Sequence, residues 1–194
     1  MAFIKTVPQE EAEGEVREMY EADLERLGYV ANYTKIFSQR PDVYKAWQGL
    51  NAAIKANMDL RRYEVATLAS AHALRSSYCC LAHGQVMLQF VPQNDLIEIM
   101  SGERDILTPV ETAIMAFAEK VTLHAHEVTQ ADVDVLREHG LTDPEIMDIV
   151  LASSARNFFS RVLDGSGTLP DAAYRSLDPE LLESLTVGRE VSPL

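Results

Sequence analysis

The stretch from Glu64 to His83 gathers residue types that could do thiol and acid–base chemistry. It holds both cysteines of the chain, Cys79 and Cys80, in an otherwise small and apolar pattern. Cys79 and His83 are four residues apart, so on a helix their Cβ atoms would be about 6 Å apart on one face. A neighbouring imidazole favours the thiolate form of a cysteine near neutral pH. The spacing therefore predicts a reactive thiol at Cys79.

Glu64 can join this pair only if the chain turns between them. In one continuous helix it would lie about 22 Å from Cys79 along the axis, too far for proton transfer. The serine pair at 76–77 is a natural break, because serine competes for backbone hydrogen bonds and caps a following helix. If the chain doubles back near Arg75, Glu64 and His83 come within about 6 Å along the axis, a gap that two side chains and a water could span. The expected order is then Glu64, His83 and Cys79.

The elements that must position these residues are predicted to be helices, and the expected fold class is all-α. Apolar residues recur at spacings of three and four, and no convincing alternating run is present. We expect one domain over residues 1–194, in which 171–194 form a weakly patterned tail, either docked or partly loose. The expected helices cover 8–27, Pro41 to about Asn57, a stretch after an Asp59 cap, Thr108 to about Thr122, Thr129 to His139, and about 17 residues after Thr142.

Composition narrows the possible partners and location. Lys and Arg number 17 against 30 Asp and Glu, and the net charge of −13 argues against nucleic acid and anionic membranes as partners. No apolar run approaches the roughly 18 residues of a membrane span, and the start MAFIKTVPQEEAEGE turns acidic too early for a signal peptide. Two cysteines are too few for a disulfide scaffold and suit a reducing compartment. We therefore expect a cytoplasmic protein.

The spacing of Glu64, Ser76, Cys79 and His83 resembles a known signature. It is similar to that of the alkylhydroperoxidase D and carboxymuconolactone decarboxylase superfamily, in its peroxidase-related branch, where the second position is a cysteine. The resemblance extends over residues 3–170. It also rests on the segments VPQEEAEGEVREMYE, YVANYTKIFSQRPDVYKAW and VTQADVDVLREHGLTDPEIMDIV.

The resemblance implies an all-helical peroxidase in which Cys79 attacks a small-molecule hydroperoxide. Glu64 and His83 would form its proton relay, and the residue at position 76 would resolve the sulfenate as a disulfide. It also implies a homo-oligomer (a dimer, trimer or hexamer) that needs no metal or organic cofactor.

Ser76 departs from that pattern, because a hydroxyl cannot form a disulfide. Cys80 could resolve Cys79 instead, but a disulfide between adjacent residues is strained, and Cys80 is expected to be a packing residue. An external thiol reductant could reduce a sulfenate on Cys79, or the redox activity could be lost. These last two alternatives carry equal weight.

Other candidate residues have simpler interpretations beside the functional ones. His72, seven residues before the first cysteine, could line the same pocket, although a histidine packed between helices is the commoner case. Tyr78 could donate a hydrogen bond to a bound oxygen or only pack. His124 and His126 have the spacing of a metal pair, but no third ligand is near in sequence, so we expect them to be exposed to solvent.

Two other functions fit the same residues. A decarboxylase or lyase acting on a small carboxylated lactone would use His83 or Glu64 as acid or base, with Arg156 or Arg161 holding the carboxylate. Alternatively, the fold could serve a non-catalytic assembly. A decarboxylase would keep its activity without Cys79, and a non-catalytic protein would show an ordinary, unactivated thiol.

Overall fold

A computed structural model describes residues 2–193, and the regular elements in that range are all helical. The all-α class predicted from the sequence is therefore confirmed. In chain order the elements are η1 (Gln9–Glu11), α1 (Gly14–Leu27), α2 (Asn32–Phe37), α3 (Pro41–Lys55), α4 (Leu60–Ala73), α5 (Ser77–Met87), α6 (Gln93–Ser101), α7 (Pro109–His124), η2 (Ala125–Glu127), α8 (Gln130–Glu138), α9 (Asp143–Gly165), η3 (Ala172–Ser176) and α10 (Pro179–Leu185).

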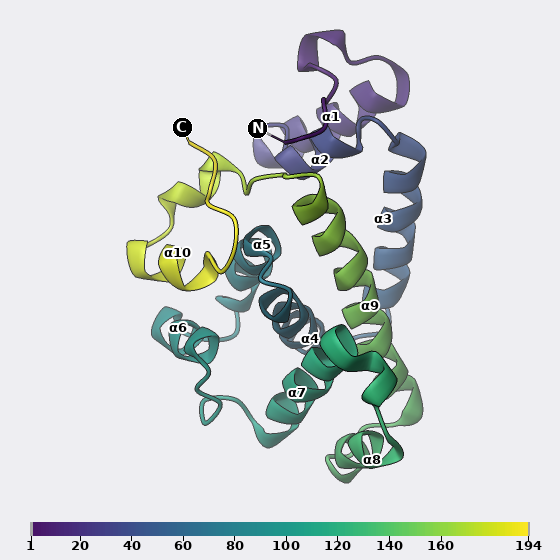
Figure 1. Cartoon of the computed structure of the whole chain (residues 1–194), viewed down its shortest axis with the longest axis vertical. Helices are drawn as coiled ribbons and strands as arrows, with labels where there is room; N and C mark the ends of the chain where they lie inside the picture. The colour runs from purple at the N-terminus through teal and green to yellow at the C-terminus, as the bar shows by residue number, and fades with distance from the viewer. Residues whose placement is uncertain (1, 194) are drawn as a thin grey trace.

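Helix α4 is the central element of the fold. Every residue from Tyr63 to Ala71 is buried, and the helix packs against α5, α7 and α9. Figure 1 shows α3 and α9 side by side along one edge, α6 and α10 on the opposite side, and α1 and α2 at the end where both termini lie. The segment that carries the predicted chemistry is therefore enclosed by helices from both halves of the chain.

The polar residues expected to start helices do so. Asp59 accepts a hydrogen bond from the backbone of Arg62, and Thr108, Thr129 and Thr142 each form a capping box with the acidic residue three positions on. Such caps satisfy backbone N–H groups that have no partner inside the helix. These local signals fix the starts of α4, α7, α8 and α9.

The expected first helix over 8–27 is wrong in its first third. A short 3₁₀ turn, η1, is followed by extended backbone at Ala12, and α1 begins only at Gly14, whose φ of 51° is left-handed. This conformation favours glycine and interrupts a right-handed helix. The expected start at residue 8 rested on a proline, which favours the first turn of a helix, but Pro8 instead precedes the 3₁₀ turn.

Other helix boundaries also differ from expectation. Two helices lie outside the ranges in which helices were expected: α2, which includes Asn32 and Tyr33, and α6. Helix α9 has 23 residues rather than about 17. Helix α3 ends at Lys55, two residues before the expected end. Short helices held by contacts with other elements carry weak local signals.

The chain doubles back between α4 and α5, as the serine pair predicts. Arg75 adopts a left-handed φ of 56°, and its backbone N–H donates to His72 while that of Ser76 donates to Ala71. Ser76 occupies the N-cap position of α5, but its side chain makes no capping hydrogen bond. The expectation that serine caps this helix is therefore wrong for Ser76, and the turn is held by backbone bonds.

The tail is docked over this turn. The backbone N–H of Gly188 donates to Ser77 Oγ at 2.7 Å, and Arg75 Nε donates to the carbonyl of Val187 at 3.0 Å. A Cβ atom at position 188 would lie 2.0 Å from the carbonyl oxygen of Arg75, so this close approach requires glycine. Leu185 of α10 packs onto Gly84 of α5 in the same way. The C-terminal residues thus fix the turn that carries the predicted site.

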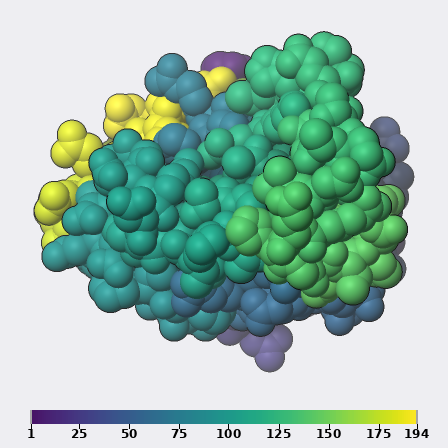
Figure 2. Space-filling model, turned by 90° about the horizontal axis from the view of Figure 1, so that it is seen from below, coloured from purple at the N-terminus to yellow at the C-terminus, as the bar shows by residue number. Residues whose placement is uncertain are grey.

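The face seen from below in Figure 2 is formed mostly by α6 to α9, with C-terminal residues at one edge. Over residues 2–193, none of the helices combines the length and the apolar character that crossing a bilayer demands.

Candidate active site at the α4–α5 turn

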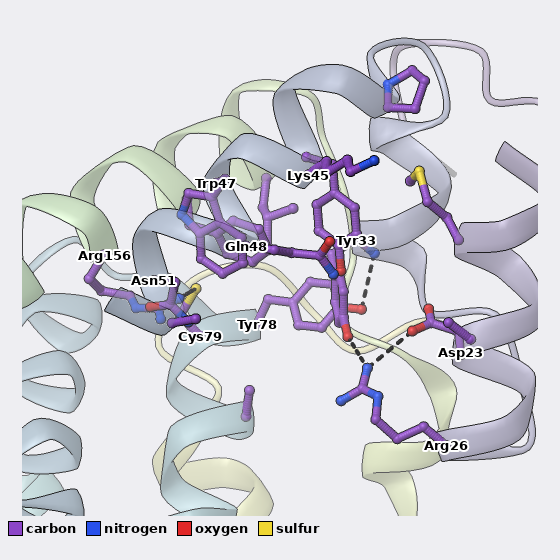
Figure 3. A pocket seen from close by; sticks show the side chains of 18 of the residues that line it. Asp23, Arg26, Tyr33, Lys45, Trp47, Gln48, Asn51, Tyr78, Cys79 and Arg156 are labelled. Carbon is purple, nitrogen blue, oxygen red and sulfur yellow. Dashed lines mark hydrogen bonds and ion pairs between the residues drawn. The ribbon is translucent and has the colours of Figure 1, made fainter. Parts of the chain in front are cut away.

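A cavity of about 610 Å³ opens beside Cys79, and we call it the Cys79 cavity. Residues of α1, α3, α5 and α9 form its walls. Figure 3 shows Cys79 next to Arg156 and Asn51 at one end, Asp23 and Arg26 at the other, and Trp47 between them. Its lining includes Arg26, Tyr33, Tyr44, Trp47, Tyr78, Cys79, His83, Arg156 and Phe159.

The Cys79 sulfur lies in the first turn of α5 and contacts a buried cation. Its side chain is almost fully buried, at 2% exposure, and Arg156 Nη1 donates to its Sγ at 3.5 Å. The amino end of a helix carries partial positive charge. The helix terminus and the guanidinium therefore both favour negative charge on this sulfur.

Arg156 comes from the middle of α9 and is held by three contacts. The first is the contact of Nη1 with the Cys79 sulfur. In addition, Nη2 lies 3.5 Å from Tyr63 Oη, and Cζ lies 5.6 Å from the centre of the Phe159 ring. Burial lowers the pKa of Arg156, but Cys79 and Tyr63 raise it, and the net shift is upward. The guanidinium therefore stays charged beside the thiol.

Glu64 and His83 form a direct pair across the helical turn. His83 Nδ1 lies 2.5 Å from Glu64 Oε2, and Thr67 Oγ1 lies 3.4 Å from the same nitrogen. Glu64 is buried, at 1% exposure. The two residues meet as expected, but no bridging water is needed, because their side chains are long enough to close the offset between α4 and α5.

This pairing sets which nitrogen of His83 is free. With Nδ1 against a carboxylate, the neutral ring carries its proton there and keeps Nε2 as an acceptor, an assignment that rests on the hydrogen bond. Burial lowers the pKa of His83, Arg156 lowers it further, and Glu64 opposes both. The ring is therefore neutral at pH 7. Because His83 also lines the Cys79 cavity, a base and a thiol share one space.

Ser76 and Cys80 lie outside the lining of the Cys79 cavity. Both are fully buried, and the Ser76 hydroxyl has no hydrogen-bond partner among residues 2–193. Burial raises the pKa of Cys80 well above its ordinary value, and the neighbouring Cys79 adds to that shift. Cys80 is thus placed as a packing residue with a thiol that stays protonated.

Tyr78 lines the cavity, but its hydroxyl is already engaged. It donates to a carboxylate oxygen of Asp171 and accepts from the backbone N–H of Tyr33 at 3.2 Å. Burial raises the pKa of Tyr78 well above its ordinary value. The suggestion that Tyr78 donates to a bound oxygen does not agree with this arrangement, whereas packing does.

His72 does not line the Cys79 cavity, so the idea that it shares this pocket is wrong. It is half-buried, burial lowers its pKa, and its charged neighbours are Glu119 and Arg104. The metal candidates His124, the last residue of α7, and His126, in η2, are both exposed. Across residues 2–193, no three His, Cys, Asp or Glu side chains are grouped closely enough to hold a metal ion.

Arg156 is the residue whose place at the thiol the sequence did not reveal. It was considered only as a carboxylate anchor, together with Arg161, which is exposed and lies outside the cavity lining. One sequence signal could have found it. Arg156 falls between Ala152 and Phe159 on the apolar stripe of its helix, and a charge on a buried stripe needs a partner.

Several solved structures share this fold. A peroxidase-related protein of Ralstonia eutropha, described as an alkylhydroperoxidase AhpD core, is 22% identical over 97% of this chain and 98% of its own, with a TM-score of 0.78. A peroxidase-related protein of Silicibacter is 25% identical over 90% and 91%, with a TM-score of 0.71. A variant of the debrominase Bmp8 in complex with 2,3,4-tribromopyrrole is 17% identical over 95% and 100%, with a TM-score of 0.72.

The resemblance to the alkylhydroperoxidase D and carboxymuconolactone decarboxylase superfamily is thereby confirmed at the level of the fold. No sequence-family model matches the chain, and neither does any curated protein. The solved structures with this fold include both peroxidase-related proteins and a debrominase, so the fold alone does not select the chemistry.

Proposed function

We propose that this protein is a thiol-dependent hydroperoxide reductase with Cys79 as its nucleophile, and that it belongs to the superfamily it resembles. The observation that carries the proposal is the buried contact between Arg156 and the Cys79 sulfur, in a cavity shared with His83. A cation beside the sulfur and a neutral imidazole held by a carboxylate are what activation of a thiol requires.

In the first step, His83 Nε2 accepts the thiol proton and Glu64 stabilises the resulting imidazolium. The Cys79 thiolate attacks the distal oxygen of the hydroperoxide, so that a sulfur–oxygen bond forms and the oxygen–oxygen bond breaks. The leaving alkoxide takes the proton from His83. Cys79 is oxidised to a sulfenic acid, and the hydroperoxide is reduced to an alcohol.

An external thiol completes the cycle, since Ser76 cannot form a disulfide and Cys80 faces away from the cavity. The first reductant thiol attacks the Cys79 sulfenic acid and releases water, leaving a mixed disulfide. A second reductant thiol then attacks the reductant sulfur of that mixed disulfide. This releases the Cys79 thiol and leaves the reductant as its own disulfide. Two electrons and two protons pass from the reductant to the peroxide.

Peroxide consumption in the presence of a small dithiol tests this proposal. We expect turnover by the native protein and none by Cys79→Ala. Equal, slow consumption of peroxide by the two proteins would refute a thiol peroxidase.

A second candidate is a decarboxylase or lyase acting on a small carboxylated lactone. It is favoured by one observation: Arg156 places a guanidinium in the cavity, where it could hold a carboxylate. In that case His83 would be the acid or base, and Cys79→Ala would retain activity on a panel of small lactones. Retained activity would select this function over peroxide reduction.

Assembly as a homo-oligomer in the cytoplasm is part of the same proposal. Met147 and Phe158 lie eleven residues apart on α9, hence on one face, and are 53% and 42% exposed. Exposed apolar side chains on one helix face are typical of subunit contacts. Light scattering that showed only a monomer at micromolar concentration would contradict the proposed homo-oligomer.

A further inference from the structure

The wall of the Cys79 cavity carries an array of nearly parallel aromatic rings, which we call the aromatic wall (Tyr44, Trp47 and Phe159). The ring centres of Trp47 and Phe159 are 4.1 Å apart with planes 21° from parallel. Tyr44 and Trp47 are 6.3 Å apart and 12° from parallel. A planar ring that enters the cavity in the same orientation extends this array, because aromatic rings attract one another in offset stacks.

The aromatic wall and the Cys79 sulfur line the same cavity. Arg26, whose side chain is 60% exposed, marks the outer end and donates to Tyr33 Oη at 2.6 Å. The Tyr33 ring is 5.8 Å from that of Phe159, which in turn lies under Arg156. Arg156 reaches Cys79, and Figure 3 shows this pair at the opposite end of the cavity from Arg26. A molecule that occupies the cavity beside the sulfur therefore also lies against aromatic side chains.

We propose that the Cys79 cavity selects arylalkyl hydroperoxides, whose ring stacks on the aromatic wall while the peroxide group reaches Cys79. This inference rests on the proposed peroxidase function and adds its substrate class. The sulfur–oxygen bond forms and the oxygen–oxygen bond breaks as described above, the external thiol supplies the electrons, and an arylalkyl alcohol leaves with its ring unchanged.

The kinetic test compares cumene hydroperoxide with hydrogen peroxide, and expresses preference as the ratio of their kcat/KM values. We expect Trp47→Leu to lower this ratio about ten-fold, the value of one lost aromatic contact. Trp47→Phe keeps an aromatic ring at this position, so we expect it to retain most of the native preference for cumene hydroperoxide. The ratio does not depend on the fraction of folded protein. An unchanged ratio in Trp47→Leu would overturn the inference.

A matched control uses the neighbouring aromatic residue on α9. Phe158 is 42% exposed and lies outside the lining of the cavity. Phe158→Leu makes the same kind of change without touching the aromatic wall, so we expect it to leave the ratio within two-fold. A ratio that fell equally in Phe158→Leu and Trp47→Leu would also count against the aromatic wall.

A binding test separates this inference from turnover. Trp47 is the only tryptophan of the chain, so its fluorescence reports on the cavity directly. In Cys79→Ser we expect 2-phenylpropan-2-ol, the product alcohol, to bind at least about ten-fold more tightly than tert-butanol. Equal affinities would overturn the aromatic preference. Tight binding of the aryl alcohol with no peroxide turnover by the native protein would instead refute the peroxidase function and support the aromatic wall.

Discussion

The two faces of α5 place adjacent thiols in opposite chemical settings. Cys79 faces the cavity and Arg156, whereas Cys80 is fully buried in the core and lies outside the cavity lining. Exposure does not distinguish them, because the two residues are 2% and 0% exposed. The two thiols are distinguished by the charge next to each sulfur. Arg156 donates to Cys79, whereas burial raises the pKa of Cys80.

Under the proposed function, this difference gives a single helical turn one reactive and one inert cysteine. Adjacent residues on a helix point about 100° apart, so a cavity on one side of α5 reaches only one of them. The buried cation comes from α9 and the base from α5 itself. Substitutions on the two faces of α5 test whether this difference in setting produces a difference in reactivity.

The largest effect is expected when each cysteine is replaced by serine in turn. Cys79→Ser removes the nucleophile and we expect peroxide turnover to fall by at least about 1000-fold. Cys80→Ser changes a packing residue and we expect turnover to stay within about three-fold per folded molecule. Stopped-flow or coupled peroxide assays measure both. Comparable losses in the two variants would erase the distinction between the faces.

His83→Gln is expected to have the next largest effect, about 100-fold on kcat/KM, because it removes the proton acceptor but keeps a similar shape. The pH profile gives a second readout. Since burial lowers the pKa of His83 below its ordinary 6.5, the native protein keeps its base at pH 6.5 and loses activity only at lower pH.

In His83→Gln this acid limb is expected to disappear. The exposed residue His126 offers a control, and His126→Gln is expected to leave the profile unchanged. An acid limb that persisted in His83→Gln would assign it to another group.

Arg156→Gln is expected to slow alkylation of Cys79 by iodoacetamide about ten-fold at pH 7, because the thiolate loses its charged neighbour. Mass spectrometry of the Cys79 peptide over time measures the rate. Arg161 lies on the same helix but is exposed, so Arg161→Gln serves as the matched control. If both variants react at the native rate, the guanidinium does not activate the thiol.

The smallest expected effect concerns the docked tail that supports the turn. Gly188→Ala places a Cβ against the carbonyl of Arg75 and is expected to lower the free energy of unfolding by about 1–3 kcal/mol. Gly49→Ala meets no atom within 4 Å in a helix interior and is expected to be neutral or slightly stabilising. Urea denaturation compares them. Equal stabilities would show that the tail does not hold the turn.

The sequence predicted those parts of the site that local rules determine. The spacing of Glu64 and His83 around a serine break predicted that the chain would bring them together, and they are hydrogen-bonded across the turn. Helix starts followed from capping residues such as Thr108 and Thr142. These features depend on neighbours within a few turns, where residue type limits the possible conformations.

The parts that the sequence did not reveal depend on distant contacts. Arg156 meets Cys79 across 77 positions, and Gly188 meets Ser77 across 111. Neither periodicity nor capping carries information over such separations. The tail appeared weakly patterned because its order comes from packing on α5 and α6 rather than from its own propensity.

Trapping the oxidised sulfur tests most directly whether Cys79 is the residue that the hydroperoxide oxidises. The native protein is treated with one equivalent of cumene hydroperoxide in the presence of dimedone, which labels sulfenic acids, and the peptide that holds both cysteines is fragmented by mass spectrometry. We expect one adduct, on Cys79, that is absent from Cys79→Ser and retained in Cys80→Ser. An adduct on Cys80, or a native protein that acquires none while its peroxide remains, would contradict it.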